Sequence, residues 1–207
     1  MSRPQITKIA ITGGPCAGKT SALTRIRKVF SARGFKVITI PEPATELISN
    51  GITPWECYSA EEYQRCQMEL QLTREAMYLR AASGMDEDKV LLVCDRGLLD
   101  NSCYMTTEEF GRTITDLGRT EEDLLASYDA VFHLVSAAKG AEEYYSTQSN
   151  ATRYESLEEA AALDDRFIKA WSGHPYLRTI GNETDFEDKL DRVCDAIWEF
   201  LQDRGIA

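Results

Sequence analysis

Five short apolar runs, separated by segments of helical periodicity, constrain the fold of this chain more than any other feature. Between the first two runs, Leu23, Ile26 and Phe30 recur at the spacing of one helix face. Such alternation is typical of βαβ units, in which helices connect parallel strands. We therefore expect an α/β fold, a three-layer sandwich around a five-stranded parallel sheet. The predicted strands are residues 6–12, 35–40, 90–94, 130–135 and 177–180.

The chain has 207 residues, which is enough for one domain with a substantial core. No low-complexity linker divides it, so we predict a single nucleotide-binding domain over residues 1–207. Helices are expected at about 44–49 and 61–82, with two more opening at Thr120 and at Thr184. Thr184 and Glu187 have the spacing of a capping box.

The net charge restricts the partners of the protein. Lys and Arg total 23 against 34 Asp and Glu, a formal net charge of −11. Such a balance disfavours the broad basic surface that holds extended nucleic acid, although a small, focused basic site remains compatible with it. No segment approaches the roughly 20 apolar residues of a membrane-spanning helix, and residues 1–8 lack the apolar core of a signal peptide. A cytoplasmic location is the resulting expectation.

The sharpest motif is the glycine-rich segment between the first predicted strand and the first predicted helix. Residues 13–20 read GGPCAGKT and match the phosphate-binding loop pattern G-x-x-x-x-G-K-[ST]. In such a P-loop the backbone amides and the following helix N-terminus face phosphate oxygens. The alternative is a glycine-rich turn at an ordinary strand-to-helix junction. The predicted nucleotide-binding residues are Gly13, Gly14, Pro15, Cys16, Ala17, Gly18, Lys19, Thr20 and Ser21.

Two further acidic residues follow predicted strands and should meet the loop at one sheet edge. The third strand ends at Asp95, which would hold Mg²⁺ together with the Thr20 hydroxyl, while Lys19 contacts the β- and γ-phosphates. The second strand ends in Pro41-Glu42-Pro43. Glu42 could take the proton of an attacking hydroxyl, or could simply be an acid at a helix N-terminus.

The P-loop, the Pro-Glu-Pro segment and Asp95-Arg96-Gly97 together resemble the P-loop kinases of small metabolites, especially deoxynucleoside kinases. The resemblance implies that Glu42 is the catalytic base and that Arg96 stabilises phosphate charge, both close to the acceptor. The chain departs from that pattern at Asp95, where Glu is commoner, and at Gly97, where the family has Ser.

Over about residues 6–200 the chain also resembles the nicotinamide riboside kinase part of bacterial NAD-regulator proteins and the TRPL-translocation-defect proteins, an AAA-type group of P-loop NTPases. This resemblance rests on the P-loop, Asp95-Arg96-Gly97, Tyr128-Asp129-Ala130-Val131 and residues 140–175. Because some of those proteins are implicated in GTP and phosphoinositide binding, it leaves the reaction open.

Other polar residues are assigned from the kinase pattern. Tyr63 and Gln64, with Gln67 nearby, resemble the aromatic-Gln pair that holds a base edge, although a solvated Gln-rich helix face explains them equally well. Residues 137–171 have the position of a kinase lid, in which Arg153 is the candidate catalytic cation, with ordinary salt bridging as the alternative. Asn182 and Thr184 follow the last strand, where this fold usually contacts the nucleotide base.

Together these features predict a Mg²⁺-dependent kinase that transfers the γ-phosphoryl group of ATP or GTP to a hydroxyl of a small nucleoside-like metabolite. The predicted catalytic residues are Lys19, Glu42, Asp95, Arg96 and Arg153. The alternative is a GTP- or ATP-binding switch that contacts a protein or phosphoinositide partner without phosphorylating a small molecule. The sequence leaves open whether the chain forms a homodimer.

Overall fold

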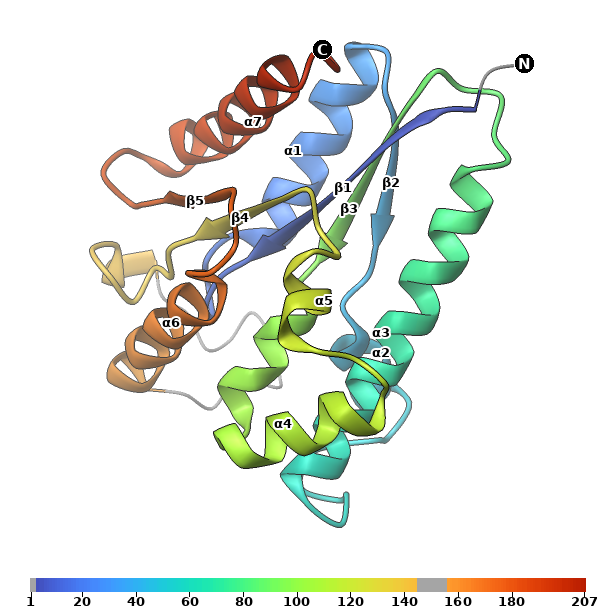
Figure 1. Ribbon diagram of the computed structural model, residues 1–207. Helices are drawn as coiled ribbons and strands as arrows, with labels where there is room; N and C mark the ends of the chain where they lie inside the picture. The colour runs from blue at the N-terminus through green and yellow to red at the C-terminus, as the bar shows by residue number, and fades with distance from the viewer. Residues whose placement is uncertain (1–2, 145–155) are drawn as a thin grey trace.

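A five-stranded, fully parallel sheet forms the middle layer of the protein. The computed structural model describes residues 3–144 and 156–207. The strands are β1 (Gln5–Thr12), β2 (Lys36–Ile40), β3 (Lys89–Asp95), β4 (Ala130–Leu134) and β5 (Leu177–Ile180). Their order is β2-β3-β1-β4-β5, so β1 lies at the centre, paired with β3 and β4 (Figure 1). The predicted α/β sandwich and its strands are confirmed, with boundaries that differ by at most one residue.

Helices cover both faces of the sheet (Figure 1). The α-helices are α1 (Lys19–Ala32), α2 (Pro43–Ser49), α3 (Ala60–Ala82), α4 (Thr107–Asp116), α5 (Glu121–Leu125), α6 (Leu157–Trp171) and α7 (Phe186–Asp203). Two 3₁₀ helices, η1 (Leu98–Tyr104) and η2 (Glu142–Tyr144), complete the described elements. None of the described helices is long and apolar enough to cross a membrane.

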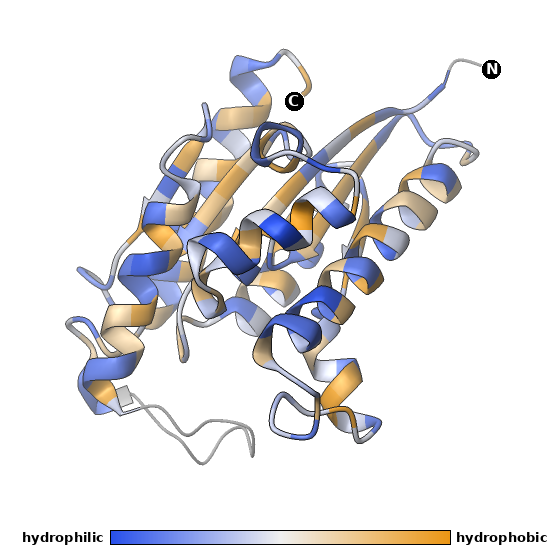
Figure 2. Ribbon diagram, turned by 60° about the horizontal axis from the view of Figure 1, so that its bottom comes forward, coloured by the Kyte–Doolittle hydropathy of each residue, from blue (hydrophilic) through white to orange (hydrophobic). Residues whose placement is uncertain are grey.

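The two largest clusters of the core lie on opposite faces of the sheet because successive side chains of a strand point to opposite sides. On one face, Ile9 and Ile11 of β1 pack with Ile26 of α1 and Val193 of α7. On the other face, Ala10 packs with residues of α3, η1, α4, α5 and α6. Successive side chains of β1 therefore pack alternately into the two helix layers, as expected for a parallel sheet buried on both sides. Figure 2 shows the strands mostly in hydrophobic colours and the helices with mixed faces.

Side-chain caps fix where several helices begin. A helix opens at Thr120 as predicted, and Thr120 caps α5 in a reciprocal box with Asp123. Ser156 and Glu159 form the same box at α6. The predicted start of the last helix is wrong by one residue. The side chain that accepts from the first turn of α7 belongs to Asp185, which bonds the amide of Asp188.

Candidate functional site

The P-loop lies at the carboxyl end of the central strand. β1 ends at Thr12, and α1 starts at Lys19. The backbone between them takes positive φ at Gly13, Cys16 and Gly18, which turns the loop tightly enough to meet the helix N-terminus. The strand–loop–helix context that the motif requires is therefore present.

A cavity of about 1250 Å³ opens beside this loop. Pockets for drug-sized ligands commonly measure about 300–1000 Å³, so this one has room for two ligands side by side. Of the predicted site residues, those lining it are Pro15, Cys16, Ala17, Gly18, Lys19, Thr20, Ser21, Glu42, Asp95, Arg96, Asn182 and Thr184. The fold thus brings segments from four strand ends to one cavity.

Lys19 is the partly buried cation at the base of the loop. Its Nζ donates to the carbonyl oxygens of Gly13 at 2.9 Å and Gly14 at 3.1 Å. Burial, followed by the repulsion of Arg96, lowers the pKa of Lys19 to about 8. An ammonium that is this poorly solvated gains strongly from a phosphate anion nearby.

Arg96 connects the P-loop to the acidic residues around it. Its Nε donates to Oε1 of Glu42 at 2.5 Å, and its Nη1 lies 3.3 Å from the Gly13 carbonyl oxygen and 3.4 Å from Oδ2 of Asp100. The guanidinium lies 4.9 Å from the ring centre of Phe167. The residue has φ of 72°, an unusual conformation for a side-chain-bearing residue, and these contacts hold it there.

Glu42 stands at the N-terminus of α2 with its carboxylate toward the cavity. Oε1 faces Arg96, and Oε2 accepts from the Thr45 hydroxyl at 3.1 Å. Burial alone would raise the pKa of Glu42, but Arg96 and Lys19 outweigh it and hold the pKa below its usual value. The group is therefore ionised at neutral pH.

Asp95 and Thr20 fit a magnesium site. Both line the cavity, and Oδ1 of Asp95 is buried without a hydrogen-bond partner among the described residues. Burial, and then the charge of Glu42, raises the pKa of Asp95 to about 6. A carboxylate with an unused oxygen, beside a hydroxyl and a phosphate-binding loop, is the donor set that Mg²⁺ takes when it binds with nucleotide phosphates.

Asp100 is a site residue that the sequence reasoning missed. It is 2% exposed and accepts from the Thr12 hydroxyl at 2.8 Å, from Nε1 of Trp171 at 2.6 Å and from Arg96. Asp100 thus ties the last residue of β1 to the end of α6 and helps to orient Arg96. Its four-residue spacing from Arg96 is the only sequence signal that could have found it.

Trp171 also accounts for a glycine at position 97. A Cβ on Gly97 would lie 2.3 Å from Cζ2 of Trp171, because the indole passes directly over this residue. Any side chain there would displace the ring that bonds Asp100.

Asn182 lies at the predicted end of the cavity, but its amide is already engaged. Nδ2 donates to the carbonyl oxygens of Ser136 and Lys139, each at 2.8 Å, and Oδ1 accepts from Nζ of Lys189 at 2.7 Å. Burial lowers the pKa of Lys189 to about 8. Asn182 therefore shapes the wall of the cavity through the backbone, and Lys189 is a further lining residue that the sequence did not single out.

The predicted base-edge residues lie apart from this lining. Tyr63, Gln64 and Gln67 are buried on α3, and Nε2 of Gln67 donates to Oε1 of Gln64 at 3.2 Å. Burial, then Cys57 and then the charge of Glu42 raise the pKa of Tyr63 to about 12. Because Glu42 lines the cavity, the Tyr63 hydroxyl lies within electrostatic reach of it. Arg153, the predicted lid cation, lies outside the described residues.

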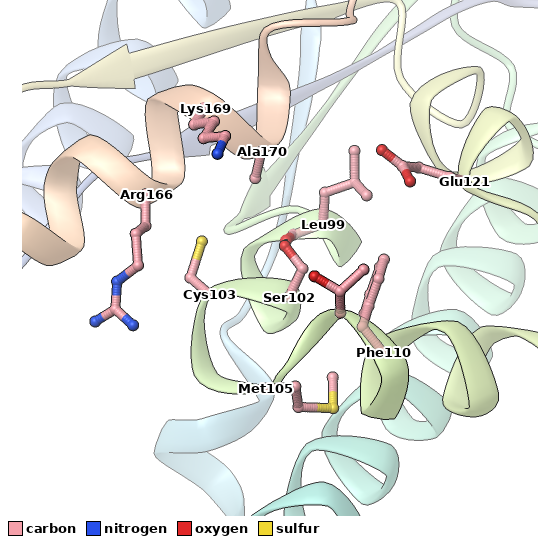
Figure 3. A pocket seen from close by; sticks show the side chains of 10 residues that line it. Leu99, Ser102, Cys103, Met105, Phe110, Glu121, Arg166, Lys169 and Ala170 are labelled. Atoms are coloured by element: carbon pink, nitrogen blue, oxygen red, sulfur yellow. The ribbon is translucent and has the colours of Figure 1, made fainter.

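A second, smaller cavity of about 360 Å³ lies between η1, α4, α5 and α6. Figure 3 shows Arg166 and Lys169 projecting from α6, with Glu121 on the other side and Leu99 and Phe110 between them. None of the predicted site residues lines it. Of these two cavities, only the larger is lined by predicted site residues.

Comparison with solved structures gives the same fold. The chain is similar to deoxyadenosine kinase from M. mycoides with bound dATP, with a TM-score of 0.60 and 18% identity over 92% of this chain and 98% of that one. The same kinase with bound dCTP gives a TM-score of 0.57 and 15% identity, covering 93% and 100% of the two chains. At this identity the likeness shows a P-loop kinase-like fold. No curated protein matches the chain.

A family model described as an AAA domain matches residues 8–189. The match spans the P-loop, both acidic strand ends and the loop after β5. The chain therefore belongs to this AAA-domain family of P-loop proteins.

Proposed function

We propose that the protein is a Mg²⁺-dependent kinase that transfers the γ-phosphoryl group of ATP or GTP to a hydroxyl of a small nucleoside-like metabolite. The observation that carries the proposal is the position of Glu42. Its carboxylate and the P-loop line the same cavity, and Arg96 bonds both Glu42 and the Gly13 carbonyl. An ionised carboxylate that lies outside the P-loop and lines the same cavity suits the orientation of an acceptor hydroxyl, which nucleotide binding alone does not require.

In this mechanism the loop and Lys19 hold the donor, and Glu42 orients the acceptor hydroxyl. A bond forms between the acceptor oxygen and the γ-phosphorus while the bond to the bridging oxygen breaks, so the nucleoside diphosphate leaves with that electron pair. The hydroxyl proton passes to Glu42. Arg96 and Lys19 stabilise the charge on the transferring group. Thr20 and Asp95 would hold Mg²⁺, which neutralises phosphate charge when bound.

The acceptor half of the cavity is lined by Ala44, Thr45, Ile48 and Ser49 of α2 and by Tyr104 of η1. Hydroxyls, two aliphatic side chains and one ring suit a sugar-bearing metabolite better than a polyanion. We assign Tyr63, Gln64 and Gln67 to the wall behind this half, and the finer kinship with nicotinamide riboside kinases or TRPL-translocation-defect proteins belongs to the same proposal.

The test is a screen of nucleosides and other small alcohols with Mg²⁺ and either ATP or GTP. We expect diphosphate release that depends on one acceptor class, and a product that has gained one phosphoryl group by mass spectrometry. Glu42→Gln should keep nucleotide affinity and reduce turnover at least about 100-fold, the lower range of a lost general base. Glu46→Gln is the matched control, because Glu46 is on the same helix and pairs with Arg74 instead.

Two results would contradict the kinase assignment. Turnover that survives in Glu42→Gln would remove the proposed base. Tight GTP binding with no acceptor-dependent release across the screen would favour the nucleotide switch.

A further inference from the structure

A buried carboxylate outside the proposed catalytic residues joins the P-loop to the helix that packs behind it. Asp164 lies on α6 and is fully buried. Its Oδ1 accepts from the backbone amide of Gly14 at 2.9 Å and from that of Ser136 at 3.1 Å. Gly14 is in the P-loop, and Ser136 lies just after β4. One oxygen therefore bonds two segments that are more than 120 residues apart in the chain.

The P-loop approaches Asp164 so closely that only glycine fits at position 14. A Cβ on Gly14 would lie 2.9 Å from Oδ1 of Asp164 and 3.1 Å from its Cβ, so only glycine leaves the loop backbone free to approach the carboxylate. This accounts for the second glycine of the motif, which the P-loop pattern itself does not require.

The charge of Asp164 is balanced locally. His133 Nε2 lies 3.1 Å from Oδ1, and Lys139 Nζ lies 3.5 Å from Oδ2. Burial would raise the pKa of Asp164, but His133 and the two amides outweigh it and hold the pKa below its usual value. An anion beside a phosphate-binding loop disfavours phosphate, so its presence there points to a role in geometry.

Ser136 connects the P-loop to the end of the cavity at Asn182 through two hydrogen bonds. Its hydroxyl donates to the Pro15 carbonyl oxygen at 2.5 Å, and its own carbonyl oxygen accepts from Nδ2 of Asn182. Pro15 and Asn182 both line the cavity. The position of Ser136, fixed by Asp164, therefore sets the distance between the phosphate end and the end at Asn182.

We propose that Asp164 is a positioning residue for the nucleotide, which holds the P-loop and the segment after β4 in register through one carboxylate oxygen. The proposal rests on the nucleotide binding proposed above. It concerns the donor alone, because Glu42 and α2 have no hydrogen bond to this network among the described residues.

The test compares Asp164→Ala with Asp164→Asn. Ala removes the acceptor and leaves two buried amides without a partner, which should weaken the binding of Mg²⁺-ATP or Mg²⁺-GTP about tenfold or more in a direct calorimetric titration. Asn keeps one carbonyl oxygen for both amides and loses the ion pair between Oδ2 and Lys139, so its affinity should stay within about threefold of the wild type. Asp165→Ala is the matched control, because Asp165 is the next residue and pairs with Lys139 at the surface.

The kinetic readout separates positioning from a general loss of structure. In the presence of an acceptor, Asp164→Ala should raise KM for the nucleotide and leave KM for the acceptor unchanged, whereas a loosened fold would impair both. If Asp164→Ala does not fold, Asp164→Ser takes its place, because its hydroxyl is one atom too short to reach Gly14.

The proposal is overturned if removal of the acceptor leaves nucleotide affinity equal to that of the Asp165 control, if Asn is no better than Ala, or if both KM values rise together. These outcomes differ from failure of the proposed function. A wild-type protein that binds no nucleotide would refute the kinase, while a wild-type protein that binds and is insensitive to residue 164 would refute only this inference.

Discussion

We predict that the buried carboxylate of Asp95 lowers the free energy of unfolding of the nucleotide-free protein at neutral pH. Its carboxyl pKa is raised from 3.8 to about 6, chiefly by burial, so the folded state prefers the protonated form. Stability that is fully present below the unfolded-state value is therefore lost as the pH rises through the raised value. A shift of about two units corresponds to about 3 kcal/mol at pH 8.

Asp95→Asn should remove this penalty, because the amide resembles the neutral carboxyl. We expect the variant to be more stable than the wild type by about 3 kcal/mol at pH 8, by about half of that at pH 5 and by little at pH 4. Denaturant unfolding of the nucleotide-free protein at the three pH values measures the differences. Asp86→Asn is the control, since Asp86 is exposed. The same substitution at Asp95 should weaken the binding of Mg²⁺-nucleotide.

The reasoning is refuted if Asp95→Asn gains nothing at pH 8, or if its gain is the same at pH 4. The first result would mean that the buried oxygen is adequately solvated. The second would mean that the gain comes from packing and not from charge.

Two more predictions concern the loop and its surroundings. Gly97→Ser should lower the free energy of unfolding by about 1–3 kcal/mol in thermal or chemical unfolding, because the new side chain displaces Trp171. Gly84→Ser is the control and should have little effect, since Gly84 lies in an open turn. An unchanged unfolding midpoint for Gly97→Ser would show that the indole moves freely. Lys19 has a pKa of about 8 in the nucleotide-free protein, so nucleotide affinity measured by calorimetry should fall from pH 7 to pH 9 as the amine loses its charge, and affinity that is flat over this range would argue against a charged contact.

The strands β1, β3 and β4 were predictable from sequence because each is a largely buried apolar run long enough to identify alone. β5 was placed without error, although two of its four residues are exposed. The start of α7 was less secure, since Thr184 and Asp185 each have an acidic residue three positions on. Only the path of the chain after β5 decides which side chain reaches the helix amides, and that path is a tertiary property.

Some residues of the candidate site were also predictable from sequence, and others were not. The P-loop, Glu42, Asp95 and Arg96 follow strand ends, so parallel topology alone brings them to one edge. Asp100 and Asp164 act through contacts that span 88 and 150 residues, which no local pattern encodes. Asp100 and Asp164 lie in a helical region that the sequence did not predict in detail. In particular, η1, α4 and the bounds of α6 were not predicted.

The central position of β1 has a consequence for the synthesis of the chain. β1 is synthesised before both of the strands that flank it, which start only at Lys89 and Ala130. At about 5–20 residues per second, its apolar residues wait roughly 5 to 20 seconds for β3 alone. The nascent chain must therefore be shielded from aggregation over that interval. The P-loop directly follows β1, so it gains its native geometry only after β3 and β4 have been translated.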